Sequence, residues 1–177
     1  MKPEMQPDNL SKPAMPPLGT VLEFMRLIWR LDHALQRTSR RMQVSLGLTS
    51  PQRLVIRVLG RFPGMRAGQL AEMLCVHPST LTPVLQRLER QGLVVRRRDP
   101  RDGRRALLGL TAKGRQFDHD TEGTVENAVR VALTELPEQK VRAAAEVIQA
   151  VCASLQSTSP RISGRMPPRS APDNPVR

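Results

Sequence analysis

The sequence predicts a mainly α-helical fold with one small β-hairpin. Apolar residues recur at helical spacing through most of residues 18–156, and proline and glycine divide this pattern into separate helices. After Gly92, two short apolar runs flank the charged segment DPRDGRR, Asp99 to Arg105, which is typical of a hairpin. Two short helices followed by an arginine-tipped hairpin predict a winged helix-turn-helix.

The first two predicted helices flank Gly47. Leu18 to Val44 carries a broad apolar stripe, so we expect one long helix that Gly47 ends. Thr49 then supplies a hydroxyl cap, a proline follows in the first turn, and Gln52 completes a capping box. The second helix is expected to stop at the Pro63–Gly64 turn. The side chains that we expect it to bury are Leu54, Val55, Val58 and Leu59.

The next two helices form the predicted helix-turn-helix. Met65 to Ala67 can add a short strand before it, and Gly68 to Leu74 forms the third helix. Cys75 to His77 makes the turn. The fourth helix begins at Pro78, runs to Arg90 or Gln91, and is stopped by Gly92. Its inward face is expected to consist of Leu81, Val84, Leu85 and Leu88.

The hairpin and two further helices complete the predicted domain. Leu93 to Arg98 and Arg105 to Thr111 are expected to pair as strands around the charged tip. The threonine that ends the second strand is the expected cap of a fifth long helix, about Ala112 to Glu135. Pro137 then begins a sixth helix, which ends near Leu155.

The charge of the chain indicates a polyanionic partner. The net charge is +12 and the isoelectric point is about 11.4. Residues 66–115 hold eleven basic side chains against four acidic ones, so the surplus lies on the predicted DNA-binding motif. Aromatic residues make up only 2% of the chain, which disfavours stacking on single-stranded nucleic acid. The sequence therefore predicts binding to double-stranded DNA.

Several other classes of protein are disfavoured. No apolar run approaches the length of a membrane span, and no secretory signal is recognisable, so we expect a cytoplasmic protein. The two cysteines lie too far apart for a metal cluster or a disulfide framework. The three histidines fall on different helices, and no phosphate-binding glycine loop is present. We expect no enzyme, metal or cofactor. An adaptor protein with the same fold would not need the concentrated charge of the hairpin.

One face of the fourth helix is expected to contact DNA. Short hydroxyl side chains near its start suit close approach to base edges or phosphates, and glutamine and arginine can pair with adenine and guanine. Pro83 is unusual, because an interior proline removes a backbone hydrogen bond and costs ~3 kcal/mol in a helix. We expect a modest bend there that alters how the helix enters the groove. The predicted contacts are Ser79, Thr80, Thr82, Pro83, Gln86, Arg87 and Arg90.

The hairpin is expected to add backbone and minor-groove contacts. Arg104 follows the flexible Gly103 at the tip, so it is our choice for insertion into the minor groove. Asp102 either positions Arg104 or a neighbouring arginine through an ion pair, or only stabilises the turn. The predicted wing residues are Arg98, Arg101, Asp102, Arg104 and Arg105.

The sequence resembles the MarR family of bacterial winged-helix regulators. The resemblance covers roughly Val21 to Leu155 and rests on the motifs LTSPQ, QLAEML, STLTPVLQRLERQGLVVRR and DPRDGRRALLGLTAKG. It implies a homodimer in which the first, fifth and sixth helices intertwine. It also implies binding to palindromic promoter sites, usually as a repressor that a small molecule or an oxidant releases. Asp102 and Arg104 match the Asp-x-Arg motif of the family's wing, whereas Gly103 stands where the family frequently has Arg or Lys.

The resemblance also suggests a domain organisation. Residues 18–156 form the expected MarR-type domain, in which residues 48–111 make the DNA-binding lobe and residues 18–47 and 112–156 make the dimerisation helices. A proline-rich leader at 1–17 and a basic tail at 157–177 are expected to be disordered.

Two features bear on regulation. TLTP, Thr80 to Pro83, resembles the peroxide-sensing branch of the family, but the first helix lacks the reactive cysteine of that branch. Cys75 is expected to be a small buried turn residue, and Cys152 to lie in core or dimer packing. The alternatives are an oxidation-responsive regulator that uses Cys75, and a non-specific architectural DNA-binding protein. An aromatic or acidic effector would occupy a pocket lined by Met25, Trp29, His33, Phe62 and Met65, although most of these also suit an apolar core.

Overall fold

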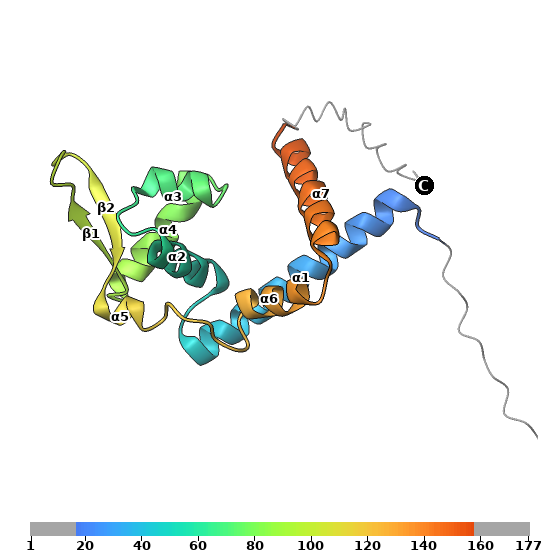
Figure 1. The fold of residues 1–177 in the computed structure, drawn as a ribbon, viewed down its shortest axis with the longest axis horizontal. Helices are drawn as coiled ribbons and strands as arrows, with labels where there is room; N and C mark the ends of the chain where they lie inside the picture. The colour runs from blue at the N-terminus through green and yellow to red at the C-terminus, as the bar shows by residue number, and fades with distance from the viewer. Residues whose placement is uncertain (1–16, 158–177) are drawn as a thin grey trace, which may run out of the picture. The chain divides into compact units, whose positions relative to one another are not determined.

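The computed structural model describes residues 17–157, so almost all of the predicted leader and of the predicted basic tail lies outside the described residues. The chain divides into two compact units, one that ends at Arg130 and one that begins at Val131. In the first unit, α2, α3 and α4 gather beside a two-stranded hairpin (Figure 1). The predicted winged helix-turn-helix is confirmed.

Helix α1 spans Thr20–Leu46 and ends as predicted at Gly47, which has a φ of +70°. Its C-terminal end packs on the rest of the unit, where Met42 is buried. There the backbone N–H of Ser50 donates to the hydroxyl of Ser39 over 2.9 Å. The apolar residues in the N-terminal half of α1 are exposed on this chain.

Helix α2 spans Ser50–Arg61 and begins with the predicted capping box, in which the backbone N–H of Thr49 donates to Oε1 of Gln52 over 2.8 Å. The predicted inward face is partly wrong. Leu54 is 52% exposed, whereas Ile56 and Arg53 are buried. The reason is that a later segment of the chain covers the Arg53 side of the helix, which turns Leu54 outward.

Helices α3 (Ala67–Met73) and α4 (Pro78–Arg90) form the predicted helix-turn-helix. Gly92, with a φ of +70°, follows α4 as expected. The core of this unit unites the buried faces of α2, α3, α4 and the hairpin. Its helical members include Val55, Ile56, Leu59, Leu70, Ala71, Leu81, Leu85 and Leu88.

Strands β1 (Val94–Arg98) and β2 (Ala106–Leu110) pair antiparallel, with Val94 opposite Leu110. The predicted strand at Met65 to Ala67 does not form a ladder of its own. Its first residue nevertheless pairs with the outer edge of β2, because the N–H of Leu108 donates to the carbonyl of Met65 over 2.8 Å.

The chain leaves the hairpin through a tight turn at Thr111 and Gly114. The Thr111 hydroxyl accepts from the N–H of Gly114 over 2.9 Å and donates to the carbonyl of Gly92 over 2.7 Å. A Cβ on Gly114 would lie 2.0 Å from the carbonyl oxygen of Leu93, so only glycine fits here. The turn therefore fastens the end of the hairpin to its beginning.

The predicted fifth long helix is wrong. The chain forms a single turn, α5 (Ala112–Arg115), and then an irregular connection before α6 (Val125–Thr134). The connection contains Gly123 at a φ of +73°, and the backbone carbonyls of Phe117 and His119 accept from the Arg53 side chain of α2 instead of closing helical turns. In the second unit, α7 (Glu138–Ser157) follows Pro137 as predicted.

Candidate nucleic-acid interface

The first turn of α4 is closed by its own side chains. Nδ1 of His77, the N-cap residue, accepts from the backbone N–H of Ser79 over 3.2 Å, so His77 caps the helix. The Thr82 hydroxyl donates to the carbonyl of Pro78 over 2.8 Å, which leaves its oxygen lone pairs available as acceptors. All seven side chains that were predicted to contact DNA from this helix are exposed: Ser79, Thr80, Thr82, Pro83, Gln86, Arg87 and Arg90.

Two arginines of α4 are held by weak contacts. Nη2 of Arg87 donates to Oε1 of Gln43 on α1 over 3.5 Å, and Nε of Arg90 donates to the carbonyl of Gln86 over 3.4 Å. Pro83 lies inside the helix, which continues through it to Arg90. The face is therefore polar, continuous and presented on one regular element.

The wing tip is closed by a set of local hydrogen bonds. The N–H of Asp99 donates to the carbonyl of Arg105 over 2.9 Å, and the N–H of Arg105 donates to the carbonyl of Asp102 over 2.8 Å. The Asp102 carboxylate accepts from the N–H of Arg104 over 3.1 Å and pairs with Nε of Arg105 over 2.8 Å. Asp102 thus both stabilises the turn and positions a neighbouring arginine through an ion pair. The partner in that ion pair is Arg105 rather than Arg104.

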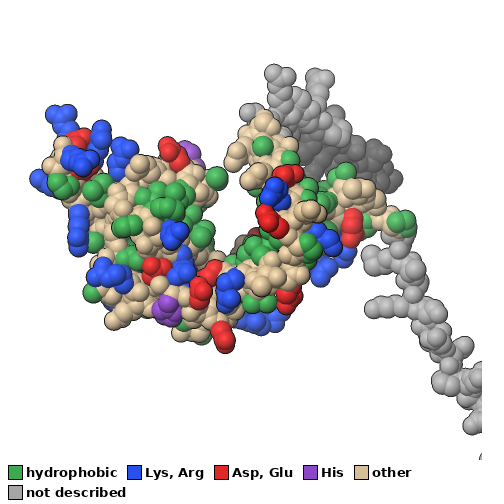
Figure 2. All heavy atoms as spheres, in the orientation of Figure 1, with side chains coloured by type: hydrophobic (Ala, Val, Ile, Leu, Met, Phe, Trp, Pro, Cys, Tyr) green, Lys and Arg blue, Asp and Glu red, His purple; other side chains and the backbone are tan. Residues whose placement is uncertain are grey.

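The remaining wing arginines are available to a ligand. Arg96 pairs with Glu89 over 2.6 Å. Within residues 17–157, no ion pair engages Arg98, Arg101 or Arg104, and all three side chains are exposed. Lys and Arg side chains gather over the hairpin (Figure 2). The wing thus concentrates exposed positive charge next to α4, which suits a phosphate backbone.

The five residues predicted to line an effector pocket are not brought together. Trp29 and His33 border a shallow hollow that, among the described residues, is lined by α1 alone, and Met25 is exposed on the same helix. Phe62 is exposed just after α2, and Met65 packs against the core of the first unit.

A different hollow lies between α2, α6 and the connection that precedes α6. Its lining combines apolar side chains with charged groups of both signs. The residues are Ser50, Leu54, Arg57, Asp120, Val125, Glu126, Val129 and Arg130.

One of the two cysteines differs from expectation. Cys75 is exposed, not buried, and its φ of +52° is left-handed. The tight turn between α3 and α4 imposes this conformation and directs the thiol outward. Cys152 is also exposed on this chain.

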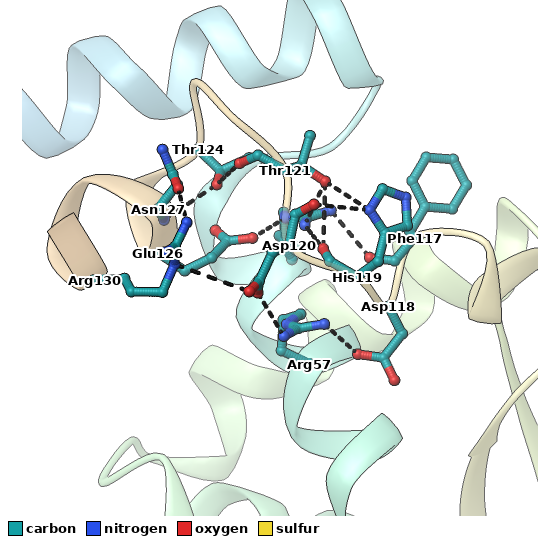
Figure 3. A network of polar contacts seen from close by, with 11 residues as sticks. Arg57, Phe117, Asp118, His119, Asp120, Thr121, Thr124, Glu126, Asn127 and Arg130 are labelled. Atoms are coloured by element: carbon teal, nitrogen blue, oxygen red, sulfur yellow. Dashed lines mark hydrogen bonds and ion pairs between the residues drawn. The ribbon is translucent and has the colours of Figure 1, made fainter.

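A network of polar contacts around Arg53 and Arg57 of α2 was not anticipated from the sequence (Figure 3). Arg53 is only 1% exposed. Its guanidinium donates to the carbonyl of Phe117 over 3.0 Å and to the hydroxyl of Thr121 over 2.9 Å, and it also binds Glu126 and the carbonyl of His119. In the sequence, the only indication of this network is that Arg53 lies inside the apolar stripe of the second predicted helix.

Arg57, one turn after Arg53, binds two acids of the same connection. Its guanidinium contacts Asp118 over 2.9 Å and Asp120 over 3.0 Å. A Cβ on Gly60 would lie 1.8 Å from the Asp118 carboxylate, so a larger residue there would displace this carboxylate from its present position. We name residues 116–124, together with their contacts to Arg53 and Arg57, the α2 clamp.

The described residues also bear on metal sites, membrane-spanning helices and shifted pKa values. Among the described residues, no three His, Cys, Asp or Glu side chains gather as a metal site. None of the helices in residues 17–157 combines the length and hydropathy needed to cross a bilayer. The hydrogen bond from Arg26 lowers the pKa of Glu23 and raises that of Arg26, but this exposed pair lies in the N-terminal half of α1, whereas α4 contacts its C-terminal end.

Comparison with known proteins gives a consistent picture. The model of the MarR family matches residues 48–106. The HTH-type transcriptional regulator TtmR of Methylorubrum extorquens is 39% identical over 88 residues, which are 50% of this chain and 45% of that protein. An HTH-type transcriptional repressor of Mycobacterium tuberculosis is 32% identical over 116 residues, which are 64% of this chain and 84% of the repressor.

A solved structure extends the similarity to the fold. The PcaV transcriptional regulator of Streptomyces coelicolor, crystallised with its natural ligand, is 28% identical and superposes with a TM-score of 0.61. The match covers 80% of this chain and 98% of PcaV. The proteins that this chain resembles are thus regulators of transcription rather than enzymes.

Proposed function

The chain belongs to the MarR family of transcriptional regulators, and we propose that it is a homodimeric repressor that reads a palindromic promoter site in double-stranded DNA. In this proposal the two copies of α4 enter successive major grooves, while the wings contact the flanking backbone and minor groove. The DNA-contacting residues are the seven exposed side chains of α4 together with Arg98, Arg101, Asp102, Arg104 and Arg105.

The observation that carries the proposal is the pairing of two exposed features. The polar face of α4 offers hydroxyl, amide and guanidinium groups that can bind base edges. The wing beside it offers arginines that no acid of the described chain neutralises, and these suit phosphates. An adaptor or an enzyme would have no use for this combination.

Support for the homodimer comes from α1. Val21, Leu22 and Ile28 are exposed on the single chain, although they belong to one broad apolar stripe. An apolar surface of this extent is unfavourable in water, and a second copy that covers it would remove the cost. The exposed apolar residues of α7, such as Ile148 and Leu155, are consistent with the same role.

Binding measurements on the full-length protein test the proposal. A duplex that carries a selected inverted repeat, with half-site centres about 34–36 Å apart, is compared at physiological salt with a scrambled duplex of equal length. We expect affinity at least about a thousandfold higher for the repeat, which is the low end for specific regulators. Equal affinity for the two duplexes would instead indicate a non-specific architectural protein.

We also propose that a small aromatic or acidic effector releases the repressor from DNA. The hollow between α2 and α6 suits such a ligand better than the residues predicted from the sequence, because three separate segments line it. Leu54 and Val129 supply apolar surface, and Arg57 supplies a guanidinium for a carboxylate. A ligand there would contact both the DNA-binding lobe and the start of α6.

A further inference from the structure

We infer that Arg53 is a positioning residue that sets the spacing of the two half-sites that the dimer accepts. Its guanidinium holds the α2 clamp, and the clamp fixes the start of α6 on the DNA-binding lobe. This inference rests on the proposed function, because half-site spacing has a meaning only for a dimer on a two-part operator.

The burial of Arg53 indicates that its contacts hold the connection before α6 in place. A guanidinium that is 1% exposed has lost nearly all its water, and such a charge is stable only if acceptors of the protein replace that water. Here the replacements are a carboxylate, two backbone carbonyls and a hydroxyl. All four acceptors lie between residues 117 and 126, so one buried side chain binds the connection along most of its length.

The connection passes this constraint to α6. The Thr121 carbonyl accepts from the hydroxyl of Thr124 over 2.6 Å, and the same hydroxyl accepts from the N–H of Asn127 over 3.3 Å. Thr124 is itself buried. Glu126, in the first turn of α6, binds Arg53 directly. The first turn of α6 is therefore attached to α2 directly through Glu126 and indirectly through Thr124 and Thr121.

Helix α2 in turn is fixed relative to α4. Val55, Ile56 and Leu59 share one apolar core with Leu81 and Leu85 of α4. A close-packed core resists displacement, so α4, α2 and the start of α6 keep fixed positions relative to one another. Arg57 adds a second anchor, but its contacts with Asp118 and Asp120 are partly exposed, and solvent screens them.

The rigid connection between α4 and α6 should restrict the spacing of half-sites that the dimer can bind. Helix α6 exposes the apolar side chains of Val129, Val131 and Leu133, so we place it in the interface of the proposed dimer. Its attachment to the DNA-binding lobe then determines how far apart the two α4 helices lie. Adding one base pair between half-sites lengthens the site by about 3.4 Å and rotates one half-site by about 35°, and a rigid dimer rejects both changes. A loosened clamp would tolerate them.

The experiment uses full-length protein and inverted repeats whose central spacer is varied from two base pairs shorter to two base pairs longer than the best site. Arg53→Lys keeps the charge and the aliphatic stem, but an ammonium cannot reach the four acceptors in the geometry of a planar guanidinium. We expect the wild-type protein to lose at least tenfold in affinity at the altered spacings and Arg53→Lys to lose less than threefold. Affinity for a single half-site should be unchanged.

Two further variants complete the design. Thr121→Val removes one acceptor of Arg53 and should flatten the spacing profile partly, which protects the test if Arg53→Lys folds poorly. Arg142→Lys is the matched control, because it makes the same substitution in an exposed ion pair with Glu138 on α7. Circular dichroism and thermal unfolding verify that each variant is folded.

The outcomes separate the two proposals. If folded Arg53→Lys and Thr121→Val keep the wild-type spacing profile, the inference is overturned and the proposed function stands. Equal weakening at every spacing and on the single half-site would also overturn it, because Arg53 would then act on the lobe itself. If the wild-type protein does not distinguish any inverted repeat from scrambled DNA, the proposed function fails and the inference fails with it.

Discussion

Arg104 and Arg105 are neighbours at the wing tip, but their surroundings differ. Asp102 engages Arg105 through an ion pair and binds only the backbone N–H of Arg104. The Arg105 side chain therefore helps to shape the turn, whereas that of Arg104 is exposed and pairs with no acid among residues 17–157. Positive charge that is not locally neutralised contributes most to attraction for phosphates.

We therefore predict that Arg104→Ala weakens operator binding while leaving the fold intact. Loss of one phosphate contact should reduce the slope of log affinity against log salt concentration by about 0.9. The measurement is a salt titration of affinity with the palindromic duplex. Arg96→Ala is the control, because Arg96 is already paired with Glu89 and should change the slope less. An unchanged slope for Arg104→Ala would mean that this side chain does not contact the backbone.

At the scale of residues, the sequence predicted which side chains of α4 and the wing are exposed. It did not predict the contacts of Arg53 or the conformation of Cys75. The polar face of α4 and the wing arginines are exposed as the amphipathic pattern requires. The role of Arg53 was missed because its acceptors lie 64 to 73 residues further along the chain, and two of them are backbone carbonyls that any residue provides. The exposure of Cys75 was missed because it depends on the left-handed conformation of a turn.

Among the elements, α4 contains an unusual residue that the helix accommodates. Pro83 has no N–H to donate to the carbonyl of Ser79, yet the helix runs on to Arg90. The buried side chains on either side, Leu81 and Leu85, hold the helix against the core. Tertiary packing thus offsets a local cost.

Replacement of this proline should have two separable effects. We predict that Pro83→Ala stabilises the protein by as much as ~3 kcal/mol, since it restores a helical hydrogen bond, and that it also changes base preference. Urea unfolding measures the first effect, and selection of binding sites from random duplexes measures the second. An identical selected motif in both proteins would exclude a role for Pro83 in sequence recognition.

Element boundaries were predicted well wherever a local signal marks them. Gly47, Thr49, Pro78 and Gly92 each begin or end a helix as expected, because caps and breakers act within one turn. The fifth helix was extended wrongly through residues 116–124. In that segment, contacts with α2 outweigh helix propensity, and these contacts depend on the folded lobe.

At the scale of the whole molecule, the proposed effector hollow and the α2 clamp share residues. Arg57 and Asp120 belong to both, and Glu126 of the hollow binds Arg53. A carboxylate that binds Arg57 would therefore compete with Asp120 of the clamp. In this way a small ligand could loosen the attachment of α6, and the same groups would connect ligand binding to DNA release.

We accordingly predict that a simple aromatic carboxylate such as benzoate or salicylate reduces operator affinity at least fivefold at saturation, within the usual range of allosteric coupling. Leu54→Glu places a carboxylate in the hollow and should abolish the response by repelling the ligand. Leu54→Gln, which lacks the charge, should retain most of it. Fluorescence anisotropy of labelled operator measures release. An equal response in wild type and Leu54→Glu would place the ligand elsewhere.

The tip of the wing is tied together by its own backbone, through the bonds between Asp99 and Arg105 and between Arg105 and Asp102. A loop that is already fixed in one conformation loses little conformational entropy when it binds a duplex. In the proposed complex, the attraction between the wing and the phosphates is then not offset by an entropic cost of ordering the loop, and binding needs no slow rearrangement of the wing.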